Sequence, residues 1–275
     1  MLAPMSSTNP IWDPQQYSRF EAERDRAALD LLLRLPSDLE PRRVVDLGCG
    51  TGQHAALLKR RHPGATVVGL DSSAAMLEQA RALGADVDWV QADLATWDPD
   101  GPVDLIFANA SLQWLPDHEG LLRRLTGLLA PGGAIAVQMP LAWDTLHYRT
   151  MRAVVADGPW SDRLSDRETI QALLSPEAYY GVLAEACEAV DVWSTNYLHA
   201  LTGPNAVLEW MKGTALRPHL TALKDDPAMR DAYLSALGDA LSVAFPRRPD
   251  GVTLLPFPRL FLVARRRRDG GGAGR

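Results

Sequence analysis

The sequence lacks the features of secreted, membrane-embedded and nucleic-acid-binding proteins. Its 275 residues include only two cysteines, Cys49 and Cys187, too few and too far apart for a disulfide framework or a metal-binding cysteine pair. No apolar run approaches the roughly 20 residues of a membrane helix, and the first ten residues do not follow the order of a signal peptide. The net charge of −6 disfavours a general nucleic-acid binder. We therefore expect a cytoplasmic protein with no metal, no nucleic acid, no membrane and no obligatory protein partner.

What the sequence does contain is an alternation of strand and helix patterns in an ordinary globular composition, 47% hydrophobic and 23% charged. Apolar runs predict strands within 42–52, 65–71, 87–93, 103–110 and 132–140. Apolar residues at helical spacing predict helices within 17–36, 53–64, 72–84 and 118–130. Ser72 or Ser73 can cap the start of the third helix, and Gly84 can end it. Such alternation is typical of βαβ units, so we expect an α/β fold with a mostly parallel sheet and helices on both faces.

The pattern changes after Met139. Residues 141–185 and 205–245 are expected to form helical segments that cover one end of the sheet, while 189–201 and 254–266 have the pattern of strands. The basic and glycine-rich end, 266–275, is typical of a disordered tail, with a basic interaction tail as the alternative. We thus expect a single domain over 1–265, with its cofactor-binding core at about 40–140.

A glycine-rich turn follows the first strand. Gly48, Gly50 and Gly52 allow the chain to turn sharply and a ligand to approach the backbone, and Asp71 ends the second strand 19 residues after Gly52. An acid at this place can accept both hydroxyls of a ribose. A nicotinamide dinucleotide favours the longer GxGxxG spacing, whereas Asp46 beside the turn favours a cationic nucleoside. The pattern therefore indicates S-adenosylmethionine as the cofactor.

Later strand ends extend this site. Asp93 can accept from the adenine amino group while Leu94 packs on the ring; the alternative for Asp71 and Asp93 is a helix-capping role. The motifs VVDLGCGTG, VVGLDSS, QADL and LAPGGAIAVQMP resemble those of class I S-adenosylmethionine-dependent methyltransferases, which implies a Rossmann-like seven-stranded sheet. Tyr17 lies in a leading helix that can fold over the cofactor or pack in the core. The residues expected to hold the cofactor are Tyr17, Asp46, Gly48, Gly50, Gly52, Asp71, Ser72, Met76, Asp93, Leu94 and Asn109.

The stretch IFANASLQWLPD, at 106–117, ends the fourth strand, where the acceptor meets the cofactor in this family. It lacks the prolines and the aromatic residue of an Asn-Pro-Pro-Tyr motif, which disfavours an amino group as the acceptor. A carboxylate is already deprotonated and needs no general base, so His118 and His147 could act as bases but are not required. Asn109 and Ser111 are therefore expected to position the acceptor rather than to move a proton.

Several further stretches resemble a bacterial family of methyltransferases that esterify a carboxylate of a small polycarboxylate. They include FANASLQWLPDH, YYGVLAEA, VDVWSTNYLH, GTALRPHL and FPRLFLVARR. Arginine binds carboxylates with a planar pair of donors. The residues expected to bind the substrate are Trp143, Arg149, Arg152, Trp210 and Arg217. Arg259, at the entry to the last strand, is a further candidate for the carboxylate. Each arginine also fits a solvated surface charge, Arg259 also fits a structural ion pair, and Trp114 fits either a pocket wall or helix packing.

Two alternative functions stay open at this point. A malonyl-carrier-protein methyltransferase shares the sheet, but its acidic protein partner requires a basic docking face around the pocket. A non-catalytic S-adenosylmethionine-binding protein would keep the glycine turn and Asp71 without arginines that face the sulfonium. The resemblance favours an enzyme that methylates a carboxylate oxygen of a small-molecule substrate.

Overall fold

The computed structural model describes residues 21–167 and 172–268, with side chains from residue 25 onward. Within these ranges the chain divides into two compact units. The sheet unit comprises residues 22–142, 172–197 and 257–268, and the helical unit comprises residues 21, 143–167 and 198–256. The glycine turn and the strand ends that follow it all belong to the sheet unit.

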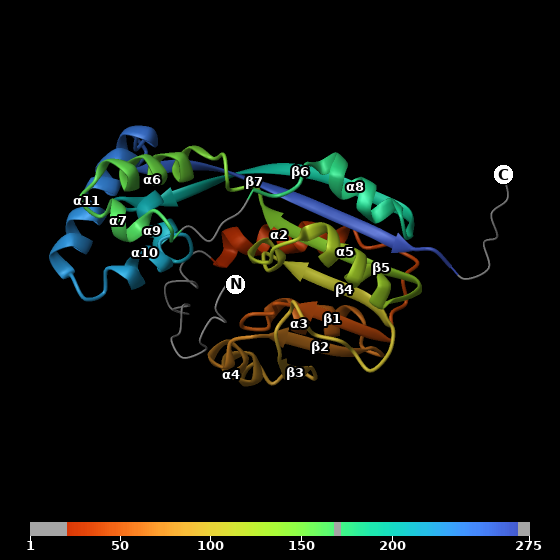
Figure 1. Ribbon diagram of the computed structural model, residues 1–275. Helices are drawn as coiled ribbons and strands as arrows, with labels where there is room; N and C mark the ends of the chain where they lie inside the picture. The colour runs from red at the N-terminus through yellow and green to blue at the C-terminus, as the bar shows by residue number, and fades with distance from the viewer. Residues whose placement is uncertain (1–20, 168–171, 269–275) are drawn as a thin grey trace. The chain divides into compact units, whose positions relative to one another are not determined.

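The sheet follows the order β3-β2-β1-β4-β5-β7-β6 and has seven strands in the described part of the chain (Figure 1). The strands are β1 (Arg43–Leu47), β2 (Thr66–Asp71), β3 (Asp88–Gln91), β4 (Val103–Asn109), β5 (Leu129–Pro140), β6 (Cys187–Thr202) and β7 (Val252–Arg266). Pairing is parallel from β3 to β5, and β7 is antiparallel to β5. The last residues of β6 and the first of β7 belong to the helical unit. The strand order reverses between β1 and β4, and ligands of open α/β sheets bind at the carboxyl ends of the strands at such a point.

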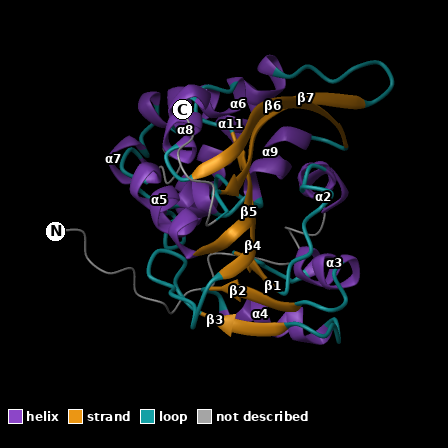
Figure 2. Ribbon diagram, turned by 90° about the vertical axis from the view of Figure 1, so that its right-hand side faces the viewer, coloured by secondary structure: helices purple, strands orange, loops and turns teal. Residues whose placement is uncertain are grey.

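Helices cover both faces of this sheet. Along β4, Ile106 packs in one apolar cluster and the next residue, Phe107, in the other, as strand alternation requires. The Phe107 cluster includes residues of α2 (Glu21–Leu33), α3 (Gln53–Arg61) and α4 (Ala74–Ala82), whereas the Ile106 cluster includes α5 (His118–Leu128) and α8 (Pro176–Ala184). Figure 2 shows α2 and α3 on one side of the strands and α5 on the other. The sheet is therefore buried on both faces, so polar residues near the ends of its strands are candidates for a functional site.

The helical unit packs five helices around aromatic residues. They are α6 (Leu146–Asp157), α7 (Ser161–Leu164), α9 (Ala206–Lys212), α10 (Arg217–Ala222) and α11 (Pro227–Ala244), counted within the described residues. Trp160 stands edge-on to Tyr233 with 5.3 Å between the ring centroids, and its Nε1 donates a hydrogen bond to the Val154 carbonyl over 2.9 Å. An indole that is buried with its one donor satisfied stabilises the junction of α6, α7 and α11.

The predicted fold class is confirmed: the sheet is mostly parallel and has helices on both faces. Ser73 caps α4 by accepting from the Met76 amide, and Gly84 ends the turn behind it with φ of +64°. The segment 141–185, expected as a helical cover of the sheet, includes α8, which belongs to the sheet unit instead. Arg266 is the last residue of β7, and residues 269–275 lie outside the described ranges. In the parts of the chain described, no helix is both long and apolar enough to cross a bilayer.

Candidate functional site

The turn after β1 has the conformation that its glycines predict. Gly48, Gly50 and Gly52 all have positive φ, between +53° and +87°, a region that other residues rarely adopt. A Cβ on Gly48 would lie 2.3 Å from the Cβ of Ser111, and a Cβ on Gly52 would lie 2.5 Å from the Trp89 ring. A Cβ on Gly50, in contrast, would meet no atom of the described residues within 4 Å. The middle of the turn is thus open to a ligand, while its two ends are packed against the sheet unit.

The amides of this turn are already used inside the protein. Gly48 and Cys49 donate to the Leu70 carbonyl over 2.7 and 2.9 Å, and Gly52 donates to the Cys49 carbonyl over 2.9 Å. Gly50 donates to Oδ2 of Asp71 over 2.9 Å. A pyrophosphate would need such amides for itself. The turn is therefore suited to a ligand that brings donors and positive charge rather than phosphate oxygens.

Asp71 can hold a ribose while it holds the turn. Its Oδ1 accepts from the Ser73 amide over 2.8 Å, and its Oδ2 accepts from Gly50. An ionised carboxylate has about four lone-pair sites, so two sites stay open for a pair of hydroxyls. The side chain is half-buried at the carboxyl end of β2. Asp71, a predicted cofactor residue, thus links the turn after β1 to the end of β2.

Asp46 is the acid next to the turn, and it is buried. Its side chain is 1% exposed, and its Oδ2 has no hydrogen-bond partner among the described residues. Burial above all, together with the negative charge of Asp71, raises the pKa of Asp46 to about 7, although His54 and the Ala55 amide act to lower it. A buried carboxylate of this kind is stabilised in its charged form by a nearby cation.

The other predicted cofactor residues lie near the same strand ends. Met76 is buried in α4, whereas Ser72 and Asp93 are exposed. Oδ1 of Asp93 accepts from the Ala95 amide over 2.9 Å. A Leu94 methyl carbon would lie 3.4 Å from a Cβ on Gly48, so this side chain lies against the turn. Tyr17 lies outside the described residues.

The end of β4 is held in a strained turn. Ala110 has φ of +53°, its amide donates to the Gln138 carbonyl over 2.9 Å, and its carbonyl accepts from the Gln113 side chain over 2.7 Å. Oγ of Ser111 donates to the Leu47 carbonyl over 2.6 Å, which ties this turn to the end of β1. Oδ1 of Asn109 is buried and, within the described ranges, has no donor. The structure therefore gives Ser111 a bond within the protein and leaves Asn109 with an acceptor available for a ligand.

The predicted substrate residues all belong to the helical unit, so each is described there. Arg152 lies over the Trp143 ring, with 4.6 Å from Cζ to the centroid, and it donates to the Trp143 carbonyl over 2.6 Å. Arg149 is exposed. Trp210 is buried and stacks on His199 with 4.8 Å between centroids. The sequence pairs Arg152 with Arg149 one turn apart, but the structure pairs it with Trp143.

Arg217 is the member of this set with unused donors. It begins α10, and its Nε and one terminal nitrogen are buried, with no acceptor in the described structure. A guanidinium stays protonated in proteins, and a buried donor without a partner costs about 1 to 3 kcal/mol or more for a charged group. An anionic ligand would offset that cost. Arg217 is therefore the arginine of the helical unit that is best prepared for a carboxylate.

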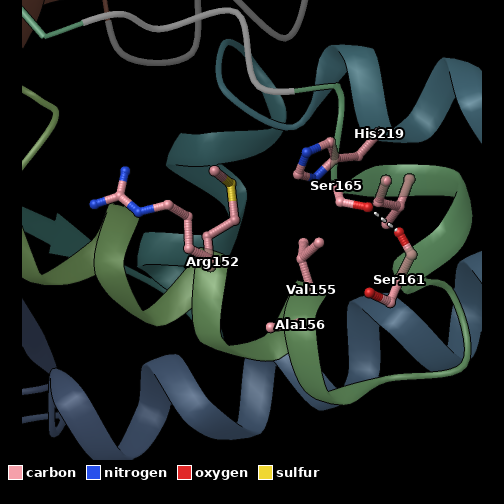
Figure 3. A pocket seen from close by; sticks show the side chains of 8 residues that line it. Arg152, Val155, Ala156, Ser161, Ser165 and His219 are labelled. Carbon is pink, nitrogen blue, oxygen red and sulfur yellow. Dashed lines mark hydrogen bonds between the residues drawn. The ribbon is translucent and has the colours of Figure 1, made fainter.

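A small pocket lies between α6, α7 and α10 (Figure 3). It has a volume of about 280 Å³ and is lined by Met151, Arg152, Val155, Ala156, Ser161, Leu164, Ser165 and His219. The His219 ring is buried, its Nδ1 is 2.7 Å from the Tyr233 hydroxyl, and burial lowers its pKa to about 4. Oγ of Ser165 donates to the Ser161 carbonyl over 2.6 Å. The lining is thus largely apolar, and the Ser165 hydroxyl and Nδ1 of His219 already have partners within the protein.

The two histidines considered as bases have structural surroundings. Nδ1 of His118 is 2.6 Å from the Tyr179 hydroxyl, and burial lowers its pKa. His147 is 1% exposed between the Tyr148 and Phe245 rings, and burial lowers its pKa to about 3. Trp114 closes a short 3-10 helix and is half-buried. Nothing in the surroundings of His118 or His147 indicates that either residue acts as a general base.

Two buried polar residues meet where β5 and β7 pair, and of these the sequence points to Arg259 but not to Gln138. Gln138 in β5 is fully buried, and its Oε1 accepts from a terminal nitrogen of Arg259 over 3.3 Å. Arg259 in β7 is 4% exposed and lies over the Phe257 ring. The signal in the sequence is a single polar residue inside the apolar run GGAIAVQMP. Its partner is 121 residues away, so pattern analysis cannot pair the two.

Comparison with known proteins agrees with this geometry. A family model described as a methyltransferase domain matches residues 44–133. The chain is 49% identical over 255 residues to a trans-aconitate 2-methyltransferase from Azoarcus sp. (strain BH72), which covers 93% of this chain and 99% of the relative. It is 49% identical over 258 residues to the enzyme of the same name from Methylobacterium radiotolerans, which covers 93% and 98%.

Solved structures share the fold at low identity. YcgJ from Bacillus subtilis has a TM-score of 0.56 at 16% identity and covers 89% of this chain and 99% of its own. A phosphoethanolamine N-methyltransferase from Haemonchus contortus has a TM-score of 0.52 at 18% identity and covers 87% and 52%. At such identities the likeness concerns the fold alone. Because the curated relatives match at 49% identity over almost their whole length, the chain belongs to the trans-aconitate 2-methyltransferase family.

Proposed function

We propose that the protein transfers a methyl group from S-adenosylmethionine to a carboxylate oxygen of trans-aconitate. The observation that carries this proposal is the similarity to enzymes of that name, which extends over both units of the chain. The sheet unit fits the cofactor: the turn is open at Gly50, four of its amides are occupied, and Asp46 on β1 and Asn109 on β4 each keep a buried acceptor atom without a partner among the described residues. These features suit a ligand with hydroxyl, ammonium and sulfonium groups, and they do not suit a pyrophosphate.

Each cofactor residue has a task that its geometry allows. Asp71 would accept the ribose hydroxyls at its open lone pairs, and Leu94 would pack on the adenine beside the turn. Asp46 would face the positive charge of the methionyl part and stabilise it. Ser72, Met76 and Asp93 stay proposed contacts of the nucleoside, and Tyr17 stays a proposed lid residue. Under this proposal the acids recognise charge and hydroxyl groups, and the apolar side chains recognise shape.

The reaction itself demands little acid–base chemistry. S-adenosylmethionine supplies an electrophilic methyl group: a carboxylate lone pair forms the new oxygen–carbon bond, and the electrons of the broken carbon–sulfur bond stay on the sulfur. No proton moves, so neither His118 nor His147 is needed as a base. The protein's contribution is alignment and exclusion of water. Asn109 would orient the reactants at the end of β4, and Ser111 would keep that strand end in place.

Recognition of a polycarboxylate requires buried cations. Arg217 offers two buried donors without an acceptor among the described residues, and we propose that it binds a carboxylate of the acceptor. Trp143, Arg149, Arg152 and Trp210 stay proposed parts of the substrate site in the helical unit. We also propose that the chain functions as a single domain. Its substrate would be a small molecule, and its location would be the cytoplasm.

The test is a turnover assay. Purified protein is incubated with methyl-labelled S-adenosylmethionine and with trans-aconitate, cis-aconitate, isocitrate or malonyl carrier protein, and base-labile methyl is counted. We expect trans-aconitate to be the best acceptor, and transfer to malonyl carrier protein alone would overturn the proposal. Arg217→Gln should raise the KM for trans-aconitate about 10- to 100-fold, because it removes a charged hydrogen bond. Arg248→Gln, which alters an exposed arginine of the same unit, is the matched control.

A further inference from the structure

Four polar residues lie on one face of the sheet, near the site. Asp46 in β1 is in register with Phe107 of β4, Asn109 follows Phe107 by two residues, and Gln138 of β5 is in register with Asn109. Arg259 precedes Phe261, the β7 partner of Gln138, by two residues. Since side chains alternate along strands, all four point to the face where Phe107 and Phe261 pack. We name Asp46, Asn109, Gln138 and Arg259 the polar row.

The polar row leaves several hydrogen-bonding atoms unused. Oδ2 of Asp46, Oδ1 of Asn109 and Nε2 of Gln138 are buried and have no partner within the described ranges. Gln138 is 0% exposed, and its carbonyl oxygen faces the Arg259 guanidinium, so its NH₂ group points elsewhere. Leaving a buried polar atom without a partner destabilises the folded protein. Native proteins rarely keep several such atoms together unless a ligand completes them.

The chemistry of the polar row changes along the sheet. Asp46 and Asn109, on β1 and β4, present acceptor oxygens toward the cofactor side. Gln138 and Arg259, on β5 and β7, present an amide donor and a buried guanidinium whose charge is permanent. The first pair suits a cation with hydroxyl or ammonium groups. The second pair suits an anion, and a carboxylate accepts two parallel hydrogen bonds of this kind.

Arg259 lies too far from Asp71 to bind the methionine carboxylate of the cofactor. Asp71 on β2 and Arg259 on β7 are four strand spacings apart, roughly 19 Å. The methionyl arm of S-adenosylmethionine has six bonds of about 1.5 Å beyond the ribose ring and reaches at most roughly 9 Å. If Asp71 holds the ribose, the hydrogen bond and the sugar ring add about 6 Å, so that arm ends at most roughly 15 Å from Asp71, short of β7. Arg259 is then on the acceptor side of the transferred methyl group.

We propose that Gln138 and Arg259 together bind a carboxylate of the acceptor, as a specificity site built into the sheet unit. This inference rests on the proposed function. The carboxylate they hold is one that is not methylated, because two charge-assisted hydrogen bonds withdraw electron density from its oxygens and weaken it as a nucleophile. The pair therefore anchors one end of a polycarboxylate while another carboxylate reacts beside Asn109. It predicts that an acceptor needs more than one carboxylate.

The test compares Arg259→Gln, Arg259→Lys and Gln138→Leu with wild type and with Arg123→Gln, a matched change at an exposed arginine. For each variant, steady-state kinetics gives kcat and the KM for trans-aconitate, and calorimetry gives the Kd for S-adenosylmethionine. We expect Arg259→Gln to raise the KM about 10- to 100-fold, with kcat and the cofactor Kd changed less than about threefold. Arg259→Lys should recover part of the loss because it keeps the charge, and Gln138→Leu should raise the KM by a smaller factor.

Each outcome separates this inference from the proposed function. An unchanged KM in Arg259→Gln and Gln138→Leu, with wild-type turnover of trans-aconitate, would overturn the inference and leave the proposed function intact. A weakened cofactor Kd with an unchanged KM would also overturn it, because the pair would then bind the methionine carboxylate. If Arg259→Gln does not fold, Gln138→Leu decides alone. If wild type methylates no carboxylate, the proposed function fails; calorimetry of trans-aconitate with S-adenosylhomocysteine present then still tests the pair, and equal binding to wild type and Gln138→Leu refutes it.

Discussion

The buried acid beside the glycine turn gives a prediction whose size can be calculated. The ordinary pKa of an aspartate such as Asp46 is 3.8, and burial raises it in the folded protein to about 7. Well below pH 4 the group is protonated in both the folded and the unfolded chain, so it makes no difference to stability. Between pH 4 and 7 the unfolded chain ionises while the folded chain holds its proton, and stability falls. At 1.36 kcal/mol for each pKa unit, the loss reaches roughly 4 kcal/mol above pH 7.

Replacing Asp46 by Asn removes this loss. The amide keeps an oxygen that can accept from the Ala55 backbone, which lowers the pKa of Asp46 in the native protein. In the absence of cofactor, Asp46→Asn should therefore be more stable than wild type at pH 8, by up to about 4 kcal/mol, and should lose most of that advantage near pH 4.5. Thermal unfolding followed by circular dichroism at both pH values measures the difference in Tm.

The control and the refuting result are well defined. Asp98→Asn removes an exposed carboxylate and should change the Tm difference little between the two pH values. A gap between Asp46→Asn and wild type that is the same at pH 4.5 and pH 8 would refute the reasoning, since the gain would then come from packing. Cofactor affinity should depend on pH in the opposite direction to stability. A cationic ligand favours the ionised form of Asp46, so the affinity of the wild type for the cofactor should rise from pH 6 to 8. The affinity of Asp46→Asn should be lower and should not follow that rise.

Three further substitutions test the turn, the strand end and the ribose site. Gly48→Ala should destabilise the protein by at least about 2 kcal/mol, because a positive φ and a contact of 2.3 Å with the Ser111 side chain act together; an unchanged Tm would contradict this close approach of the turn to Ser111. Ala110→Gly should relieve a φ of +53° and stabilise by up to about 1 kcal/mol, and a clear fall in Tm would show that the turn is not strained. Asp71→Ala should weaken cofactor binding at least about tenfold because it removes two backbone contacts and the ribose acceptor; titration with S-adenosylhomocysteine measures this, and an equal Kd would remove Asp71 from the site.

The parts of the fold that could be predicted are those that depend on local patterns. The strand that ends in DLGCGTG and the acid that ends the next strand lie within one βαβ unit, so spacing predicts the turn and an acid at the same edge of the sheet. The hydrogen bond from the Gly50 amide to Asp71 was not predicted. The cap at Ser73 and the stop at Gly84 are equally local. The positive φ of Ala110 could not be predicted in this way, because alanine carries no signal for it. It arises where the amide and carbonyl of Ala110 both bond to glutamine residues.

Arginine roles were the least predictable feature of the site. The sequence shows several arginines after Met139, and composition cannot tell a solvated charge from a buried one. The structure separates them by their contacts: Arg152 is held by Trp143, Arg149 is exposed, and Arg217 keeps buried donors that no described residue accepts. A pattern of charges therefore indicates that an anion is bound, but only packing shows which cation is prepared for it.

The pairing of Gln138 with Arg259 shows why the acceptor side of the site depends on the antiparallel strand. In a parallel βαβ unit, neighbouring strand ends come from nearby segments, and the cofactor side of this sheet is built in that way from residues 46–109. β7 instead enters from the far end of the chain and reverses direction, so it brings a buried guanidinium beside the carboxyl end of β5. A sheet of parallel strands alone would present acceptor atoms and helix termini at this edge. The antiparallel strand adds a fixed positive charge from within the core, and a guanidinium is the side chain best suited to bind a carboxylate.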